Sequence, residues 1–262
     1  MVDLDQVTDD LRAEHEDLDA VVADLPEQDF DLDTPAEGWT IRDQLAHLAF
    51  FDEQAVLAVT DPPSFAEGLT ALAADPQAFM DAPLRRARGM RAGEVLSWWR
   101  SARAESLRGF ASLDPSARIP WYGPPMSPAS FVSARLMETW AHGQDVVDGL
   151  GRDRPATARL RHIAHLGVRA RDFSYRIRGL EPPAAPVEVS LVAPDGGRWE
   201  WNPGQRDRVA GPAHDFCLVV TQRRHPADTS LETEGPIAAE WMRIAQVFAG
   251  PPGKGRRPGQ FA

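Results

Sequence analysis

The sequence predicts a mainly α protein, in which a four-helix bundle over residues 1–178 is followed by a smaller α+β domain over residues 187–249. Two observations lead to this prediction. Apolar residues recur at spacings of three, four and seven through the first part of the chain, which is the period of amphipathic helices. At "RGLEPPAAPVEVSLV" the pattern changes to a proline-rich connector followed by alternating apolar and polar residues, which is typical of a strand. We therefore expect two domains.

An apolar stripe marks each of the first two helices. The stripe of the first helix is formed by Leu4, Val7, Leu11, Leu18, Val21 and Leu25. The second helix is expected to begin after Thr40, because threonine caps a helix N-terminus well and an acidic residue, Asp43, follows three positions later. Its stripe runs from Ile41 to Val59.

Proline and glycine set the limits of the later helices. After weaker helical stretches, "RAGEVLSWWRSARAESLRGFASL" predicts the third helix. The prolines of "ARIPWYGPPMSP" exclude a regular helix, whereas Pro128 is suited to the first position of the next one. The fourth helix should therefore run from Pro128 to about Gly149, where Gly149 and Gly151 supply a stop. "ATARLRHIAHLGVRARDFSYRI" predicts a fifth helix.

The second domain is predicted from shorter signals. "VEVSLV", the turn "DGG" and "RWEW" indicate a β-hairpin. "GPAHDFCLVVTQRR" is interpreted as a helix, although a short buried strand would fit the same apolar run. "GPIAAEWMRIAQVFAG" predicts a terminal helix, and residues 250–262 hold too few apolar side chains to fold, so they are expected to form a flexible tail.

Charge and cysteine content restrict the class of function. The formal net charge of −11, from 39 acidic and 28 basic residues, would repel phosphate backbones and anionic lipid, so neither nucleic acid nor membrane is expected as a partner. Cys217 is the only cysteine, which excludes an internal disulfide and a cysteine-based zinc site. No apolar run approaches the ~18 residues of a membrane span. A reducing cytoplasm is the expected location.

One row of the fourth helix consists of ionisable residues. Arg135, Glu138, His142 and Asp145 fall within about 80° on a helical wheel. Such a row is usually a solvated face, and a Glu-x-x-x-His pair occurs readily by chance. The same spacing would, however, place Glu138 and His142 on adjacent turns, where they can bind one ion. On these residues alone, both interpretations stay open.

Two stretches together carry a family resemblance. "GWTIRDQLAHL" and "RLMETWAHGQDVVDGLG" resemble the signature segments of the DinB-like superfamily, specifically its mycothiol-dependent maleylpyruvate isomerase branch. In that branch a histidine of the second helix and a Glu-x-x-x-His pair of the last bundle helix hold a divalent ion, usually zinc. The resemblance therefore implies that His47, Glu138 and His142 are metal ligands. It also implies a DinB-like bundle and a small α+β second domain, which fits "VEVSLVAPDGGRWEWNPG" and "LETEG".

The resemblance further implies a thiol-dependent reaction on a small molecule. Mycothiol is the expected cosubstrate, and a metal-bound thiol would be deprotonated at neutral pH. Addition of the thiolate to a cis-enoyl acid would permit rotation about the former double bond before elimination. The family carries Thr-Gly-Arg with an important arginine, where this chain has Thr221-Gln222-Arg223, so Arg223 is the expected carboxylate anchor and Arg224 its rival. The alternatives are a metal hydrolase and a non-catalytic protein that binds a metal or a small molecule.

Overall fold

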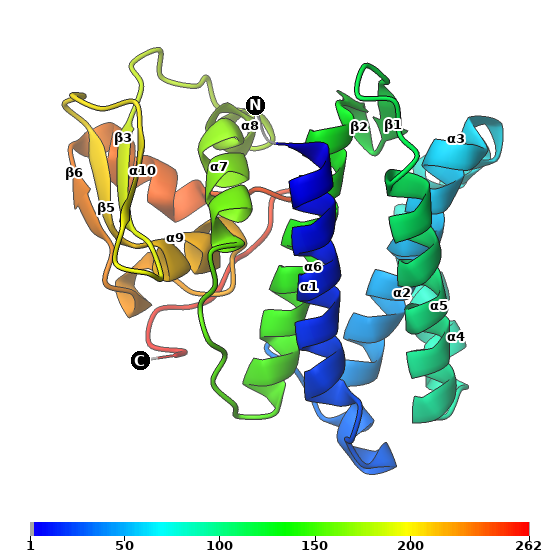
Figure 1. The fold of residues 1–262 in the computed structure, drawn as a ribbon. Helices are drawn as coiled ribbons and strands as arrows, with labels where there is room; N and C mark the ends of the chain where they lie inside the picture. Colours follow the sequence, from blue (N-terminus) through cyan, green and yellow to red (C-terminus); the bar gives the residue numbers. More distant parts are fainter. Residues whose placement is uncertain (1–2, 262) are drawn as a thin grey trace. The chain divides into compact units, whose positions relative to one another are not determined.

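The computed structural model describes residues 3–261, and these form two compact units that divide between Arg154 and Pro155. The first unit is helical and the second combines helices with a small sheet (Figure 1). The predicted mainly α architecture with a following α+β part is confirmed. The units divide after Arg154, whereas the sequence predicted that the first domain extends to residue 178. The difference arises because the predicted fifth helix packs within the second unit.

Four long helices form the bundle of the first unit (Figure 1). They are α1 (Leu4–Val22), α2 (Ile41–Thr60), α5 (Ala92–Phe110) and α6 (Pro128–Gly149). Helix α1 packs against α6, and α2 packs against both α5 and α6. Leu45, Val95 and Trp99 are fully buried between these helices. The bundle thereby places α2 and α6 side by side.

The starts of α2 and α6 confirm the predictions from local chemistry. Thr40 caps α2 through the capping box with Asp43: the Asp43 amide donates to Thr40 Oγ1, and the Thr40 amide donates to Asp43 Oδ2. Pro128 occupies the first turn of α6 behind the N-cap residue Ser127. Because these contacts lie within four residues, the sequence alone was enough to predict both starts.

Shorter elements connect the long helices of the first unit. They are the 3₁₀ helix η1 (Glu27–Asp31), α3 (Pro62–Ala74), α4 (Pro76–Arg88), β1 (Ile119–Trp121) and β2 (Gly123–Met126). Strands β1 and β2 pair as an antiparallel hairpin in the proline-rich stretch, where the sequence predicted only the absence of helix. Trp121 of this hairpin stacks on Phe65 of α3, with ring centroids 5.6 Å apart.

The second unit contains a four-stranded sheet of order β4-β3-β5-β6 (Figure 1). The strands are β3 (Glu188–Val192), β4 (Arg198–Trp201), β5 (Arg208–Pro212) and β6 (Glu232–Glu234). The predicted hairpin is β3–β4, with Val189 opposite Trp201. Strand β5 pairs parallel with β3 and β6 pairs antiparallel with β5; neither strand was predicted. The helices of this unit are α7 (Leu160–Arg169), α8 (Arg171–Arg176), α9 (Ala213–Val220) and α10 (Pro236–Ile244), with η2 (Pro226–Asp228).

Two helical predictions in this unit had different outcomes. The helix interpretation of "GPAHDFCLVVTQRR" is confirmed by α9. The predicted fifth helix is divided into α7 and α8, because the backbone leaves the helical conformation at Ala170. Helix α7 packs closely on α9: a Cβ placed on Gly167 would lie 2.9 Å from the side chain of Val220. Within residues 3–261, no helix is long and apolar enough to cross a membrane.

The C-terminal segment, expected to be a flexible tail, makes specific hydrogen bonds. The Gly253 amide donates to Gln246 Oε1 at 2.9 Å, and Gln246 Nε2 donates to the carbonyl of Pro251 at 3.1 Å. The Gly259 amide donates to Asp228 Oδ1 at 2.7 Å. Hydrogen bonds thus hold this segment against the rest of the second unit. The prediction of a flexible tail considered only apolar side chains and did not include them.

Candidate metal centre

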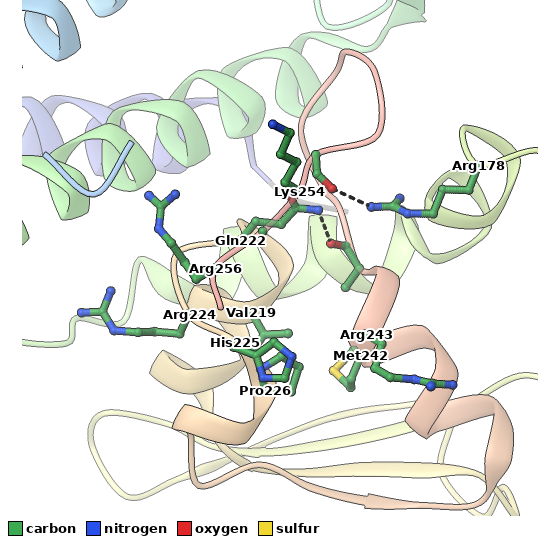
Figure 2. Close-up of a pocket in the computed structure, with 13 residues that line it drawn as sticks. Arg178, Val219, Gln222, Arg224, His225, Pro226, Met242, Arg243, Lys254 and Arg256 are labelled. Atoms are coloured by element: carbon green, nitrogen blue, oxygen red, sulfur yellow. Dashed lines mark hydrogen bonds between the residues drawn. The ribbon is translucent and has the colours of Figure 1, made fainter. Parts of the chain in front are cut away.

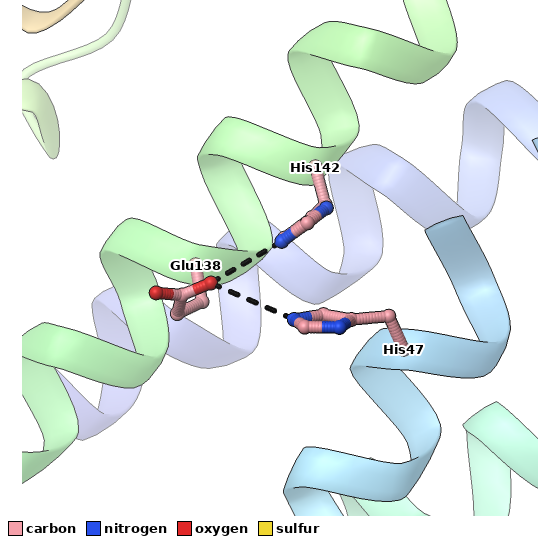
Figure 3. Close-up of side chains that lie close together, drawn as sticks. All are labelled: His47, Glu138 and His142. Atoms are coloured by element: carbon pink, nitrogen blue, oxygen red, sulfur yellow. Dashed lines mark ion pairs between the residues drawn. The ribbon is translucent and has the colours of Figure 1, made fainter. Parts of the chain in front are cut away.

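Three predicted ligands converge between α2 and α6. His47 comes from α2, and Glu138 and His142 lie one turn apart on α6. Glu138 Oε2 lies 3.2 Å from His142 Nε2 and 3.8 Å from His47 Nε2. Figure 3 shows the carboxylate of Glu138 facing both imidazoles. One ligand atom from each residue lies within 4.8 Å of the others, and among the described residues this is the one such group of three.

The spacing of the donor atoms suits a bound ion. Two ligand atoms at about 2.1 Å from a tetrahedral zinc ion lie roughly 3.4 Å apart, which falls between the two measured separations. Two imidazole nitrogens and one carboxylate oxygen are also a donor set that zinc and related transition metals accept. Three protein ligands leave a coordination position open, as in catalytic rather than structural sites.

Burial and hydrogen bonds set the protonation states of His47 and Glu138. Burial, reinforced by neighbouring His142, lowers the pKa of His47 to about 3, so its imidazole is neutral at pH 7. Burial alone would raise the pKa of Glu138, but hydrogen bonds with His142 and His47 outweigh it and hold that pKa well below its usual value. The site thus presents an ionised carboxylate beside a neutral imidazole.

Aromatic side chains enclose the two imidazoles. Trp39, just before α2, stacks on His142 with an interplanar angle of 18° and a centroid distance of 5.9 Å. The ring centroid of Phe51, one turn after His47, lies 4.5 Å from that of His47. The side chains of His47 and His142 are only 10% and 11% exposed, whereas that of Glu138 is 22% exposed. Solvent therefore reaches the centre mainly from the side of the carboxylate.

Gln44 contacts the site although the sequence did not single it out. This fully buried side chain of α2 places Oε1 2.5 Å from His142 Nδ1. Its Nε2 donates to Thr34 Oγ1 at 2.8 Å. The available signal was position: Gln44 precedes His47 by three residues, so both lie on one face of the helix.

The ionisable row of α6 is not a solvated face. Arg135 is 2% exposed and Asp145 is fully buried. Arg135 donates from Nε and Nη2 to Asp52 Oδ1 of α2, at 3.1 and 2.8 Å. The solvated-face interpretation is therefore wrong, because α6 packs against α2 on this side and a buried carboxylate satisfies the arginine. Through Arg135, this row links α6 to α2, and these two helices carry the predicted ligands.

His15, which offered no ligand pattern in the sequence, is also buried beside this ion pair. Its Nε2 lies 4.0 Å from Asp52 Oδ2, and the side chain is 2% exposed. Burial, reinforced by Arg103 and Arg135, holds the pKa of His15 well below its usual value. His15 is thus a neutral core residue.

Arg223 lies in the second unit, after α9. Its Nη1 donates to the carbonyl of Thr221 at 2.7 Å. Gln222 has a φ of 61°, a left-handed conformation that the glycine of the family motif would adopt without strain. Gln222 Nε2 donates to the carbonyl of Ala245 at 3.0 Å. Glutamine thus replaces the glycine of Thr-Gly-Arg, but the backbone keeps a conformation that glycine favours.

A pocket beside this turn collects positive charge. Its lining contains no carboxylate among the described residues. The cations around it are Arg178, Arg224, Arg243, Lys254 and Arg256 (Figure 2). Arg178, in the turn after α8, also donates to the carbonyl of Gly253 at 3.3 Å, which links this turn to the C-terminal segment. In a chain of net charge −11, this part of the second unit favours anions.

Comparisons with known proteins bear on this geometry. Residues 11–147 match the family model of the mycothiol maleylpyruvate isomerase N-terminal domain. Two proteins described as uncharacterized, from Mycobacterium tuberculosis strains CDC 1551 and H37Rv, are each 49% identical over 248 residues, which cover 94% of this chain and 96% of theirs.

Two solved structures are similar in fold. A crystal structure of the mycothiol-dependent maleylpyruvate isomerase has a TM-score of 0.59, and that of a histidine-to-alanine mutant of this enzyme has a TM-score of 0.62. Each is 14% identical, and each match covers 94% of this chain and 97% of the other. At this identity the likeness concerns the fold, which extends through both units.

Proposed function

Because the chain belongs to the family defined by the mycothiol maleylpyruvate isomerase N-terminal domain, we propose that it is a metal-dependent enzyme that uses a thiol cosubstrate on a small electrophilic acid. The reaction is isomerisation of the acid or transfer of the thiol to it. The observation that carries this proposal is the convergence of His47, Glu138 and His142. Their donor atoms and partial burial fit a catalytic ion, and so do the protonation states of His47 and Glu138.

In this proposal His47, Glu138 and His142 hold one divalent ion, with zinc the best match to two nitrogens and one oxygen. The ion would supply a deprotonated thiol at neutral pH, since a coordinating thiol loses its proton outright. Trp39 and Phe51 shield the imidazoles from water, so the open side near Glu138 is where a thiol and an acid would enter. The matched family and the similar solved structure are both named for mycothiol, so mycothiol is the first thiol to test.

We assign the substrate carboxylate to Arg223. A guanidinium binds a carboxylate through two parallel hydrogen bonds, which fixes the orientation of the acid as well as its charge. The left-handed backbone at Gln222 supports this assignment, because it keeps a conformation that the family glycine would adopt. Arg224 is the competing residue, since it lines the cationic pocket of the second unit.

Thiol-dependent isomerisation of a cis-enoyl diacid tests the proposal. Arg223→Ala should retain its metal and lose turnover by about 10- to 150-fold, the value of one hydrogen bond to a charged group. Arg223→Lys should recover only part of the loss, because it lacks the planar fork. Arg224→Ala should have little effect; the reverse pattern would move the anchor to Arg224.

The same assay separates the alternatives. Cleavage of a bond in the substrate by water, without any thiol, would show a metal hydrolase. Saturable binding of the acid without product would show a binding protein. Either result would overturn the proposed thiol-dependent reaction.

A further inference from the structure

The side-chain amide of Gln44 lies between His142 and Thr34, and these two partners allow it only one orientation. Oε1 faces His142 Nδ1 at 2.5 Å and Nε2 faces Thr34 Oγ1 at 2.8 Å. The side chain is fully buried in α2, so water cannot replace either partner. The orientation of this amide therefore decides which nitrogen of His142 carries a proton.

Thr34 determines that orientation. A threonine hydroxyl has one hydrogen, and Thr34 Oγ1 donates it to the carbonyl of Trp39 at 2.8 Å. The hydroxyl oxygen can then only accept from Gln44, so the amide nitrogen must face Thr34. The amide oxygen accordingly faces His142, and Nδ1 must donate to it.

The segment that holds Thr34 is itself fixed around the site. Asp33 and Thr40 form a β-bridge, and the Thr34 amide donates to the carbonyl of Trp39 at 2.9 Å. Trp39, at the end of this turn, places its ring against His142. A Cβ on Gly149 of α6 would lie 3.0 Å from the carbonyl of Asp33, so the end of α6 also packs closely on the turn.

From these contacts we propose that Gln44, oriented by Thr34, is a positioning residue that keeps a proton on His142 Nδ1 and so makes Nε2 the metal-binding atom. This proposal rests on the proposed function only in assuming that a metal binds at this site. Nε2 is the atom that faces Glu138, 3.2 Å away. While Nδ1 keeps its own hydrogen, a metal can take the place of any hydrogen that Nε2 shares with the carboxylate. A hydrogen-bonded partner on the other ring nitrogen also fixes the ring angle and raises the basicity of the ligand.

Metal affinity and folding are to be measured on matched variants. Gln44→Leu keeps the buried volume but removes the acceptor, and should weaken zinc binding by about 10- to 100-fold, the range for partners of metal-bound histidines. Gln44→Glu retains an acceptor and should bind zinc at least as well as the wild type. Thr34→Val frees the amide to turn and should weaken binding, whereas Thr34→Ser should not. Equal zinc affinity in the Leu and Glu variants would refute the positioning role.

A second measurement is independent of the metal. In the metal-free wild-type protein, long-range ¹H–¹⁵N spectra should show His142 Nδ1 protonated, and Gln44→Leu should reduce that population. A neutral His142 with the proton on Nε2 alone would overturn the inference even if zinc binds. Absence of zinc binding by the wild type, together with a protonated Nδ1, would instead refute the proposed function and leave the role of Gln44 intact.

Discussion

Removal of Arg135 should destabilise the bundle through the carboxylate that it leaves behind. Arg135 of α6 and Asp52 of α2 form a buried ion pair, with side chains 2% and 1% exposed. Loss of one partner of such a pair typically costs about 3–5 kcal/mol, because the remaining charge is buried without compensation. Arg135→Met should therefore lower the free energy of unfolding at pH 7 by that amount.

The pH dependence of this loss identifies its cause. Burial raises the pKa of Asp52, and Arg135 opposes the rise. Without Arg135, the pKa of Asp52 in the folded state climbs further above its unfolded value. A carboxyl group with a raised folded pKa stabilises the protein most at low pH, and this stability is lost as pH rises through the folded pKa. The deficit of Arg135→Met should therefore be smaller at pH 5 than at pH 7.

Urea unfolding followed by circular dichroism at both pH values provides the assay. The double variant Asp52→Leu/Arg135→Met removes both charges and should unfold within about 1 kcal/mol of the wild type. Arg85→Met, at an exposed pair with Asp81, is the control and should change the free energy by less than about 0.5 kcal/mol. A cost below about 1 kcal/mol for Arg135→Met, or a double variant as unstable as the single one, would refute the reasoning.

Two further predictions concern other buried positions. The depressed pKa of His15 means that only the unfolded chain takes up a proton there, so stability should fall as pH drops below about 6.5, by up to about 1.4 kcal/mol per unit. His15→Leu should flatten this dependence in urea titrations, and an unchanged slope would contradict the prediction. In the second unit, Gly167→Ala forces a methyl group against Val220 and should cost about 1–3 kcal/mol in thermal unfolding. Gly93→Ala, where the added methyl meets no atom within 4 Å, should not destabilise.

Local chemistry explains what the sequence could predict. Thr40 with Asp43 and the proline at position 128 act within a few residues, so they located the starts of α2 and α6. The "DGG" turn likewise located the β3–β4 hairpin. Strand β5 could not be found in this way, because it is short and its parallel partner β3 precedes it by a long connection. The pairing of β5 with β3 forms only when the second unit is folded.

The same distinction applies to the site. The resemblance to the family supplied His47, Glu138 and His142, and the structure brings all three together. A helical wheel assigns charged residues to solvent, and so could not predict that Arg135 meets Asp52, 83 residues away in sequence. Gln44 carries no charge and belongs to no ligand motif, so its role emerges only from its contacts.

The metal content of purified protein tests the central claim most directly. Inductively coupled plasma mass spectrometry should find about one divalent ion per wild-type chain, because one group of donor atoms converges in the described structure. His47→Ala, Glu138→Ala and His142→Ala should each lower that content, whereas His165→Ala, an exposed histidine of α7, should not. Full metal retention by all three ligand variants, or a wild type that holds no ion after purification and zinc addition, would contradict the account.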